Sequence, residues 1–369
     1  MKLIANLKLT PTKEQESALR STLERCNEAC IWLSQSAFEQ GVFRQYDMHK
    51  AFYAELRSRF GLSAQVAVRC IAKVADSYKL DQKKVRVFRK HSAQPYDDRI
   101  FRFVDKDMVS IWLLSGRNKI SFACGEHQRR LLEHRKGEVD LMFVRGKWYI
   151  CAVCDFDDPG LLTPDGMLGV DMGIANIASD SLGNQYSGAV VEAYRARYAK
   201  RRAELQRVGS RAAKRRLRKT GGKQQRFQKH QNHCISKAIV STAERYGMGI
   251  ALEDLTHIRS RVKANKEQRK RLHNWGFGQL RTFVEYKAKR AGLPVETVDP
   301  RNTSRACFEC GHVSKSNRKT QSEFRCQVCG HSNNADLSAA RNIAGRVLVN
   351  VPESFSHRNV LGAVKSPVL

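Results

Sequence analysis

The chain has 369 residues and carries 66 Lys and Arg against 36 Asp and Glu, a formal net charge of +30. No apolar run approaches the roughly 18 residues of a membrane span, and the first residues lack the apolar core of a secretory signal. We therefore expect a cytoplasmic protein with no membrane partner. A charge this large predicts a polyanionic partner, most often nucleic acid. A solvated basic surface and a membrane-surface binder are the alternatives.

The positive charge is concentrated in the second half of the chain. Residues 1–166 carry a net charge of +7, and residues 167–369 carry +23. Residues 195–229 alone hold 15 basic residues and a single acid, Glu204. This stretch predicts a phosphate-binding surface, with a solvated helix face as the alternative.

The first part of the chain predicts a sheet with helices inserted after its first strand. Alternating apolar residues over 3–9 indicate an opening strand, and the spacing of Thr12 and Gln15 is typical of a capping box at a helix start. Further helices are expected near 48–60 and 64–80. Short strands are expected over 99–104, 109–114, 119–122, 139–144 and 147–155.

Asp, Pro and Gly residues predict a linker near 157–166. The region beyond it predicts strands over 167–171, 177–179, 249–253 and 295–298. Helices are expected over 191–246 with a break near Gly221-Gly222, then over 278–291 and 337–347. The tail over 349–369 has no apolar period and is expected to be flexible.

Four of the eleven cysteines have metal-ligand spacing. Two C-x2-C pairs lie 15 residues apart, formed by Cys307, Cys310, Cys326 and Cys329. Four thiolates fill the tetrahedral shell of Zn²⁺, so the pattern predicts a zinc ribbon with one structural ion and no open catalytic position. Cys151 and Cys154 also form a CxxC, but on a strand their side chains face opposite ways, which favours core packing.

Three acids stand out because of what surrounds them. Asp171 and Glu253 each end a short apolar strand, and Asp336 opens a helix of small residues. Buried carboxylates brought together repel one another, and a hard divalent cation such as Mg²⁺ or Mn²⁺ relieves that repulsion. Taken singly, each acid is more often a cap or an ion-pair partner.

The order of these motifs resembles TnpB, the RNA-guided nuclease family of bacterial and archaeal insertion sequences, which is related to the type V CRISPR effectors. The matching segments are Gly169-Val170-Asp171-Met172-Gly173, Leu252-Glu253-Asp254-Leu255, Cys307…Cys310-Gly311, Cys326…Cys329-Gly330 and Asp336…Ala339-Ala340…Asn342-Ile343. The resemblance covers roughly residues 1–345. Its C-terminal motifs are specific, whereas its N-terminal part matches by pattern.

The resemblance implies an α+β multidomain fold. A β-barrel wedge domain over 1–10 and 81–158 would contain an inserted helical recognition domain over 11–80, followed by the linker over 159–166. An RNase H-like (RuvC) α/β nuclease domain over 167–300 and 331–348 would contain the zinc ribbon over 301–330, and a flexible tail would follow over 349–369.

The resemblance also assigns roles to residues. Asp171, Glu253 and Asp336 become a catalytic triad that binds Mg²⁺ or Mn²⁺, while a guide RNA from the transposon end pairs with target double-stranded DNA. The basic residues expected to hold phosphates are Arg201, Arg202, Lys214, Arg215, Arg216, Arg218 and Lys219.

The sequence therefore predicts a metal-dependent endonuclease that acts as a monomeric ribonucleoprotein in a prokaryotic cytoplasm. A short target-adjacent motif would be read by the wedge and recognition domains, and one site would cut both DNA strands in turn. Two alternatives stay open: an RNA-guided repressor without cleavage, disfavoured by the intact triad, and a guide-independent structure-selective nuclease, disfavoured by the zinc ribbon and the large N-terminal module.

Overall fold

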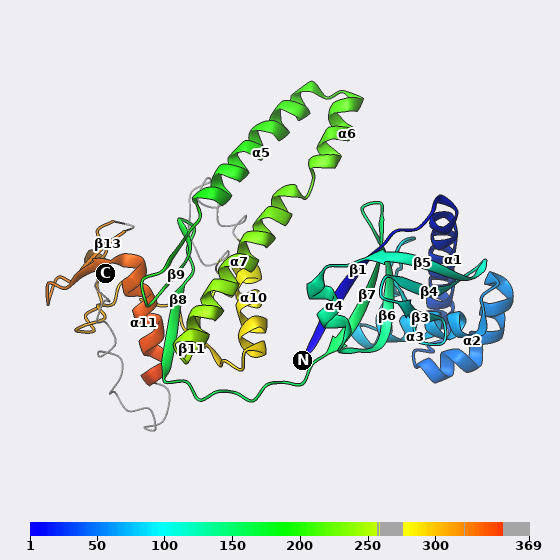
Figure 1. The fold of residues 1–369 in the computed structure, drawn as a ribbon, viewed down its shortest axis with the longest axis horizontal. Coiled ribbons are helices and arrows are strands. Elements are labelled where there is room, and N and C mark those ends of the chain that lie inside the picture. The colour runs from blue at the N-terminus through cyan, green and yellow to red at the C-terminus, as the bar shows by residue number, and fades with distance from the viewer. Residues whose placement is uncertain (257, 259–275, 321, 350–369) are drawn as a thin grey trace. The chain divides into compact units, whose positions relative to one another are not determined.

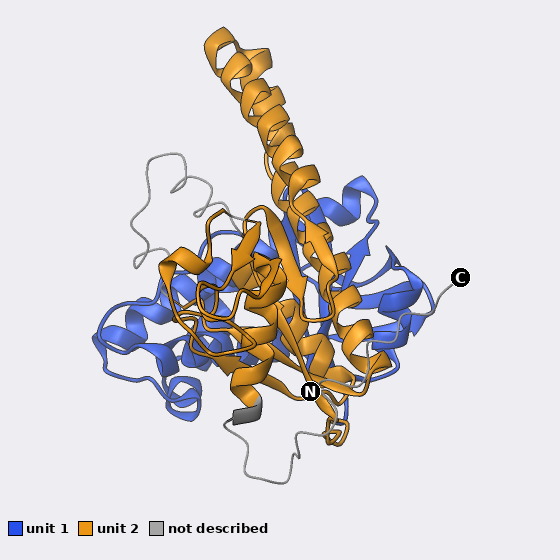
Figure 2. Cartoon of the chain, turned by 90° about the vertical axis from the view of Figure 1, so that its left-hand side faces the viewer, with its two compact units in different colours: residues 1–157 blue, residues 158–369 orange. Residues whose placement is uncertain are grey.

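The computed structural model describes residues 1–256, 258, 276–320 and 322–349. The chain divides into two compact units, residues 1–157 (unit 1) and 158–369 (unit 2), which are coloured separately in Figure 2. None of the described helices is long and apolar enough to cross a membrane. The expected tail lies outside the described residues from position 350 onward.

Unit 1 is built around one antiparallel sheet of seven strands in the order β2-β6-β7-β1-β5-β4-β3. Its strands are β1 (Lys2–Leu9), β2 (Gln94–Tyr96), β3 (Phe101–Asp105), β4 (Met108–Leu113), β5 (Gly116–Ala123), β6 (Arg135–Val144) and β7 (Lys147–Asp155). The first strand pairs with β7 along almost its whole length, as expected. Only residues 97–100 separate the two edge strands β2 and β3, so these edges lie close at one end and the sheet is nearly closed.

Three helices inserted after β1 cover this sheet: α1 (Lys13–Glu39), α2 (Gln45–Phe60) and α3 (Ala64–Leu80) (Figure 1). The predicted capping box at Thr12 and Gln15 is present and begins α1. The helices bury apolar faces against the strands in a single core that includes Leu23 of α1, Ile71 of α3 and Ile150 of β7. A short helix, α4 (Glu126–Leu132), was not predicted.

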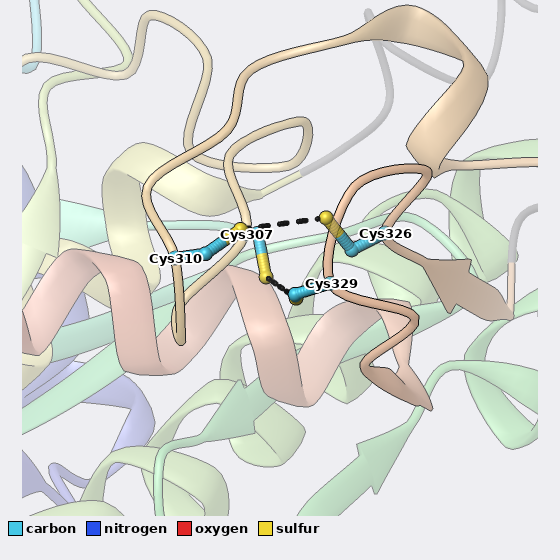
Figure 3. A group of neighbouring side chains, drawn as sticks. All are labelled: Cys307, Cys310, Cys326 and Cys329. Carbon is cyan, nitrogen blue, oxygen red and sulfur yellow. Dashed lines mark hydrogen bonds between the residues drawn. The ribbon is translucent and has the colours of Figure 1, made fainter.

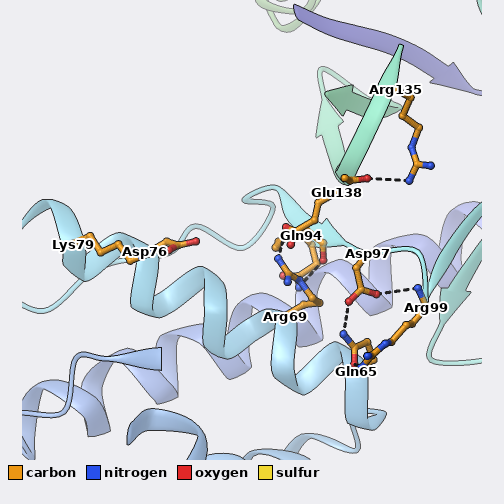
Figure 4. A network of polar contacts seen from close by, with 11 residues as sticks. Gln65, Arg69, Asp76, Lys79, Gln94, Asp97, Arg99, Arg135 and Glu138 are labelled. Atoms are coloured by element: carbon orange, nitrogen blue, oxygen red, sulfur yellow. Dashed lines mark hydrogen bonds and ion pairs between the residues drawn. The ribbon is translucent and has the colours of Figure 1, made fainter. Parts of the chain in front are cut away.

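Polar side chains tie α3 to the neighbouring strands and loops (Figure 4). Arg69 of α3 forms an ion pair with Glu138 of β6. Gln65 of α3 donates a hydrogen bond to Asp97, next to β2, and accepts one from Arg99 at 3.2 Å. These contacts fix the helical insertion to the strands that close the sheet.

Unit 2 contains a five-stranded sheet in the order β10-β9-β8-β11-β12. Its strands are β8 (Gly166–Asp171), β9 (Asn176–Asp180), β10 (Gln185–Ser187), β11 (Met248–Glu253) and β12 (Val295–Val298). Strands β8, β11 and β12 run parallel, whereas β9 and β10 are antiparallel to their neighbours. The expected strands of this region are thus confirmed, and the carboxyl ends of β8 and β11 lie at the same edge.

Helices cover both faces of this sheet. On one face, α7 (Lys223–Arg245) and α10 (Phe277–Arg290) pack against Leu168 of β8 and Leu252 of β11. On the other face, α11 (Ala335–Val349) contributes Ile343, which packs against Ala251. The helix approaches β8 so closely that a Cβ atom on Gly169 would lie 2.0 Å from the carbonyl oxygen of Ala340, so only glycine fits there.

The basic region forms three helices separated by two breaks, whereas the sequence predicted a single break. Helices α5 (Ala189–Val208) and α6 (Arg211–Thr220) precede α7, and the three project from the sheet in Figures 1 and 2. The break at Gly221-Gly222 is confirmed. A second break follows α5, where Gly209 has φ +62° and the Ser210 side chain caps α6 by accepting from the Ala213 amide.

Candidate functional site

Strand alternation places two of the three predicted acids on the face of the sheet that α11 covers. Successive side chains of a strand point to opposite faces. Asp171 therefore shares a face with Met167, and Glu253 shares one with Ala251; both apolar residues pack against α11. Since Val170 lies beside Leu252 in the parallel register, the two acids end neighbouring strands.

The third acid, Asp336, reaches the same edge from the first turn of α11. Two side chains hold its carboxylate. The amide of Asn176, at the start of β9, donates to Oδ2 at 2.9 Å, and Arg318 lies 3.4 Å from Oδ1. Asp336 thus accepts contacts from the start of β9 and from the segment between the two cysteine pairs.

The three acids act on one another electrostatically. Burial is the largest cause that raises the pKa of Asp171 to about 7; the negative charges of Glu253 and Asp336 add to it, and Arg318 opposes them. Two like charges near a half-buried carboxyl group disfavour its ionised form. The structure thus brings together the three acids that the sequence singled out, in a cluster that is strained when all are ionised.

Glu253 is the most buried of the three, with 6% of its surface exposed. Burial raises its pKa, and the hydrogen bond that the Thr303 hydroxyl donates to Oε1, at 2.5 Å, lowers it. Asn342 of α11 holds the Thr303 loop by donating to the carbonyl oxygens of Thr303 and Ala306, each at 2.8 Å. One rotamer of Glu253 is therefore supported by a chain of contacts that leads back to α11.

The four cysteines form a tighter group than the acids. Within the described part of the chain, they are the one set of three or more His, Cys, Asp or Glu side chains whose ligand atoms all lie within 4.8 Å of one another. The Sγ atoms of Cys307 and Cys329 are 3.6 Å apart, and those of Cys310 and Cys326 are 3.5 Å apart (Figure 3). The carboxylates are near enough to interact but not gathered this closely.

Both cysteine pairs have the same backbone turn. The amide of Cys307 donates to the carbonyl of His312 at 2.9 Å, and the amide of Cys326 donates to that of His331 at 2.8 Å. Gly311 and Gly330 follow the pairs with φ +74° and +73°, a conformation that favours glycine. A hydrogen bond with the Cys329 backbone is the main cause that lowers the pKa of Cys326 to about 6, which favours the thiolate that binds metals.

The seven basic residues expected to hold phosphates lie on the projecting helices. Arg201 and Arg202 are on α5 and the other five are on α6, and all seven are exposed. None of them forms an ion pair with another described residue. Their positive charges are therefore open to solvent and to an anionic partner.

Two contacts of the site went unpredicted. Asn176 follows the glycine-containing turn after Asp171, and Arg318 lies between the two cysteine pairs. Neither residue belongs to a recognisable sequence motif. Each contacts Asp336 only in the folded chain, and Asn176 is separated from Asp336 by 160 positions in the sequence. The second cysteine pattern, at Cys151 and Cys154, belongs to β7, where Cys154 is buried in the core.

Comparisons with known proteins bear on this site directly. Residues 277–343 match the family model described as Cas12f1-like, TNB domain. The CRISPR-associated endodeoxyribonuclease Cas12f1 of Sulfoacidibacillus thermotolerans is 34% identical over 221 residues, which cover 54% of this chain and 50% of the relative. The TnpB-like protein MJ0751 of Methanocaldococcus jannaschii is 39% identical over 128 residues, 34% of this chain and 45% of the relative.

The chain is thus similar to TnpB-like proteins and to Cas12f1 endodeoxyribonucleases over parts of its length. Its fold agrees with this relationship. A solved Cas12f1–sgRNA–target DNA complex contains a chain that matches with a TM-score of 0.58 at 14% identity, covering 89% of this chain and 83% of the other. The chain spans about half the length of the curated relatives it matches.

Proposed function

We propose that this protein is an RNA-guided DNA endonuclease, in which a transposon-derived guide RNA pairs with double-stranded target DNA. The observation that carries the proposal is the meeting of Asp171, Glu253 and Asp336 at one edge of the unit 2 sheet. The family relationship supports RNA guidance, because the Cas12f1 relative is named as an endodeoxyribonuclease and the Cas12f1 structure holds a guide RNA and target DNA.

The donor set of this edge fits a divalent metal. Three carboxylates offer hard oxygen ligands, and a cation bound among them would oppose the two causes that raise the pKa of Asp171, namely burial and the charges of Glu253 and Asp336. Bound Mg²⁺ or Mn²⁺ would supply an activated water and charge stabilisation at the leaving oxygen of a phosphodiester. The site thus has the ligands for phosphodiester hydrolysis.

The side chains of the protein hold this ligand set in place. Thr303 orients Glu253 through its hydroxyl, and Asn176 fixes one oxygen of Asp336. Arg318 lies against the other oxygen and supplies a positive charge beside the place where a phosphate would enter. These contacts restrict the carboxylates to one arrangement before substrate arrives.

The cysteine cluster fits structural zinc. With Zn–S bonds of 2.3 Å, tetrahedral geometry requires sulfur atoms about 3.8 Å apart. The two observed distances of 3.5 and 3.6 Å are close to this value. Zinc would hold the segment over 301–330 in shape, and with it the Arg318 loop that reaches Asp336.

The remaining parts fit the same function. In this proposal the nearly closed sheet of residues 1–10 and 81–158 is the wedge barrel, and the helices over 11–80 are the recognition domain. The RuvC-like domain spans 167–300 and 331–348, after a linker over 159–166. The exposed cations of α5 and α6 contact the phosphates of the guide RNA or of its duplex with DNA.

The experiment is to co-express the chain with its flanking transposon end and to sequence the RNA that co-purifies. The resulting ribonucleoprotein is then incubated with matched double-stranded DNA and Mg²⁺, beside the Asp171→Ala variant. We expect a discrete guide RNA, cleavage of matched DNA and no cleavage by the variant. Cleavage that persists in Asp171→Ala would overturn the active-site assignment, and cleavage without a matched guide would overturn RNA guidance.

A further inference from the structure

Three aromatic rings form a continuous stack on the projecting helices. The rings of Tyr194 on α5 and Phe227 on α7 lie 4.1 Å apart and only 11° from parallel. Tyr198, one turn further along α5, stacks on Tyr194 at 4.6 Å and 26°. The order is therefore Phe227, Tyr194, Tyr198, and we call these three residues the ring column.

The inner end of the column is a structural contact between the helices. Phe227 packs against the core of unit 2, and its stack with Tyr194 joins α7 to α5. Arg195 makes a second tie, because it pairs with Glu192 and donates to Gln228 of α7. The two helices are thus clamped together without any contribution from Tyr198.

The outer end of the column has no such structural purpose. Among the described rings, Tyr194 is the one that stacks on Tyr198, and it belongs to the same helix. Tyr198 is partly exposed, and the guanidinium of Arg197 lies 5.9 Å from its ring centroid. A hydrogen bond with the Tyr194 side chain and then the positive charges of Lys223 and Arg197 lower the pKa of its hydroxyl. A flat ring between cations is a surface on which a nucleobase stacks while the cations hold its phosphates.

The column begins beside the carboxylate edge. Strand β10 runs in the same direction as β8, so α5 starts at the edge where Asp171 lies. The amide of Gly188, which precedes α5, donates to the carbonyl of Ala175 at 2.8 Å, and the next residue, Asn176, holds Asp336. At 1.5 Å per residue, Tyr194 and Tyr198 lie about 8 and 14 Å along α5 from this point.

We infer that the outer face of Tyr198 is a stacking site for an unpaired base of the DNA strand that is delivered to the three carboxylates. DNA is the occupant because the column stands at the edge where the cut strand must pass. The stack would hold the strand on α5 while its phosphate lies at the carboxylates. This inference rests on the proposed function, but its test requires neither guide RNA nor cleavage.

The test measures oligonucleotide binding by the full chain in EDTA. A single-stranded 20-nucleotide DNA with one 2-aminopurine, and an RNA of the same sequence, are titrated against the wild type, Tyr198→Leu and Tyr198→Phe. We expect Tyr198→Leu to weaken DNA binding roughly 5- to 100-fold and to remove the quenching of 2-aminopurine. Tyr198→Phe keeps the ring, so its affinity should stay within about twofold.

A matched control is Tyr246→Leu, which removes another exposed tyrosine that has an arginine over its ring, Arg245, but lies at the far end of α7. We expect its DNA affinity to equal that of the wild type. Unchanged DNA binding by Tyr198→Leu, with unchanged melting temperature, would overturn the inference. A loss confined to the RNA would also overturn it, because the occupant would then be the guide rather than the cut strand.

Discussion

The cysteine cluster and the carboxylate edge are assembled in different ways. All four cysteines lie within one short segment, and two local turns of the same design bring their sulfur atoms together. The carboxylates come from two strands and a helix that are spread over 166 residues, from Asp171 to Asp336. Their meeting depends on the parallel pairing of β8 with β11 and on the packing of α11.

This difference explains why the sulfur atoms are gathered more closely than the carboxylates. The cysteine group is compact because its backbone turns set the spacing. At the carboxylate edge, burial first and then the charges of Glu253 and Asp336 raise the pKa of Asp171 to about 7. The cysteine segment and the carboxylate edge nevertheless meet, because Arg318 lies between the cysteine pairs and contacts Asp336. We therefore expect that disrupting the cysteine cluster will disturb the carboxylates, and that substituting a carboxylate will leave the cysteine cluster intact.

The largest effect should come from Glu253→Gln, which removes a carboxylate but keeps its shape. We expect cleavage of guide-matched DNA to fall at least about 1,000-fold, equivalent to about 4 kcal/mol of transition-state stabilisation. Asp254→Asn is the matched control, because this neighbouring acid faces Thr256 and Arg281 instead. It should cleave within about threefold of the wild type. If both variants lost cleavage activity equally, the loss would come from disturbing the end of β11 and not from removing the Glu253 carboxylate.

The cysteine cluster is tested by Cys326→Ser, with Cys234→Ser as the control on an exposed cysteine outside the cluster. Bound zinc, measured by mass spectrometry of the metal, should fall from about one ion per chain to almost none in Cys326→Ser. Cys234→Ser should keep its zinc. Cleavage should fall in Cys326→Ser as well, because the loop with Arg318 loses its support. A variant that lacks zinc but cleaves normally would contradict this dependence.

The pH dependence of stability should differ between the wild type and Asp171→Asn in EDTA. The folded pKa of Asp171, about 7, lies above the ordinary value of 3.8. Its protonated form therefore adds stability that is complete below about pH 4 and is lost as the pH rises through about 7. The melting temperature of the wild type should fall relative to Asp171→Asn over this range, and Mg²⁺ should reduce the fall. A constant difference between the two proteins from pH 4 to 8 would show that the pKa of Asp171 is not raised in the folded protein.

The smallest effect is expected from Thr303→Val, which removes the hydroxyl that lowers the pKa of Glu253. Loss of about 1 kcal/mol of hydrogen bonding should shift the acidic limb of the cleavage pH profile upward by about 0.5 to 1 unit. Rates on the alkaline side should change little. Thr303→Ser keeps a hydroxyl and should retain the wild-type profile. An equal loss of rate at every pH would indicate a structural role for Thr303 instead.

Local patterns predicted most of the regular structure. The capping box at Thr12 begins α1 because both of its contacts lie within one turn. The strand from Lys2 to Leu9 and the paired cysteines are likewise visible in short stretches of sequence. The break at Gly209 was not predicted, although glycine commonly ends a helix and serine commonly caps the start of the next one, as Gly209 and Ser210 do here. Strand β2 has only three residues, too few to show a period.

By itself, the sequence determined the positive charge of the chain, the spacing of the four cysteines and the places of the three acids at strand or helix ends, because each depends on residue type and local spacing. Only the tertiary structure decided how those acids meet, that Asn176, Thr303 and Arg318 hold them, and that Tyr194, Tyr198 and Phe227 stack into one column. Apart from the Tyr194–Tyr198 pair, which lies within one helical turn, these contacts join residues far apart in the chain. Their geometry is set by sheet register and helix packing, which no short stretch of sequence encodes.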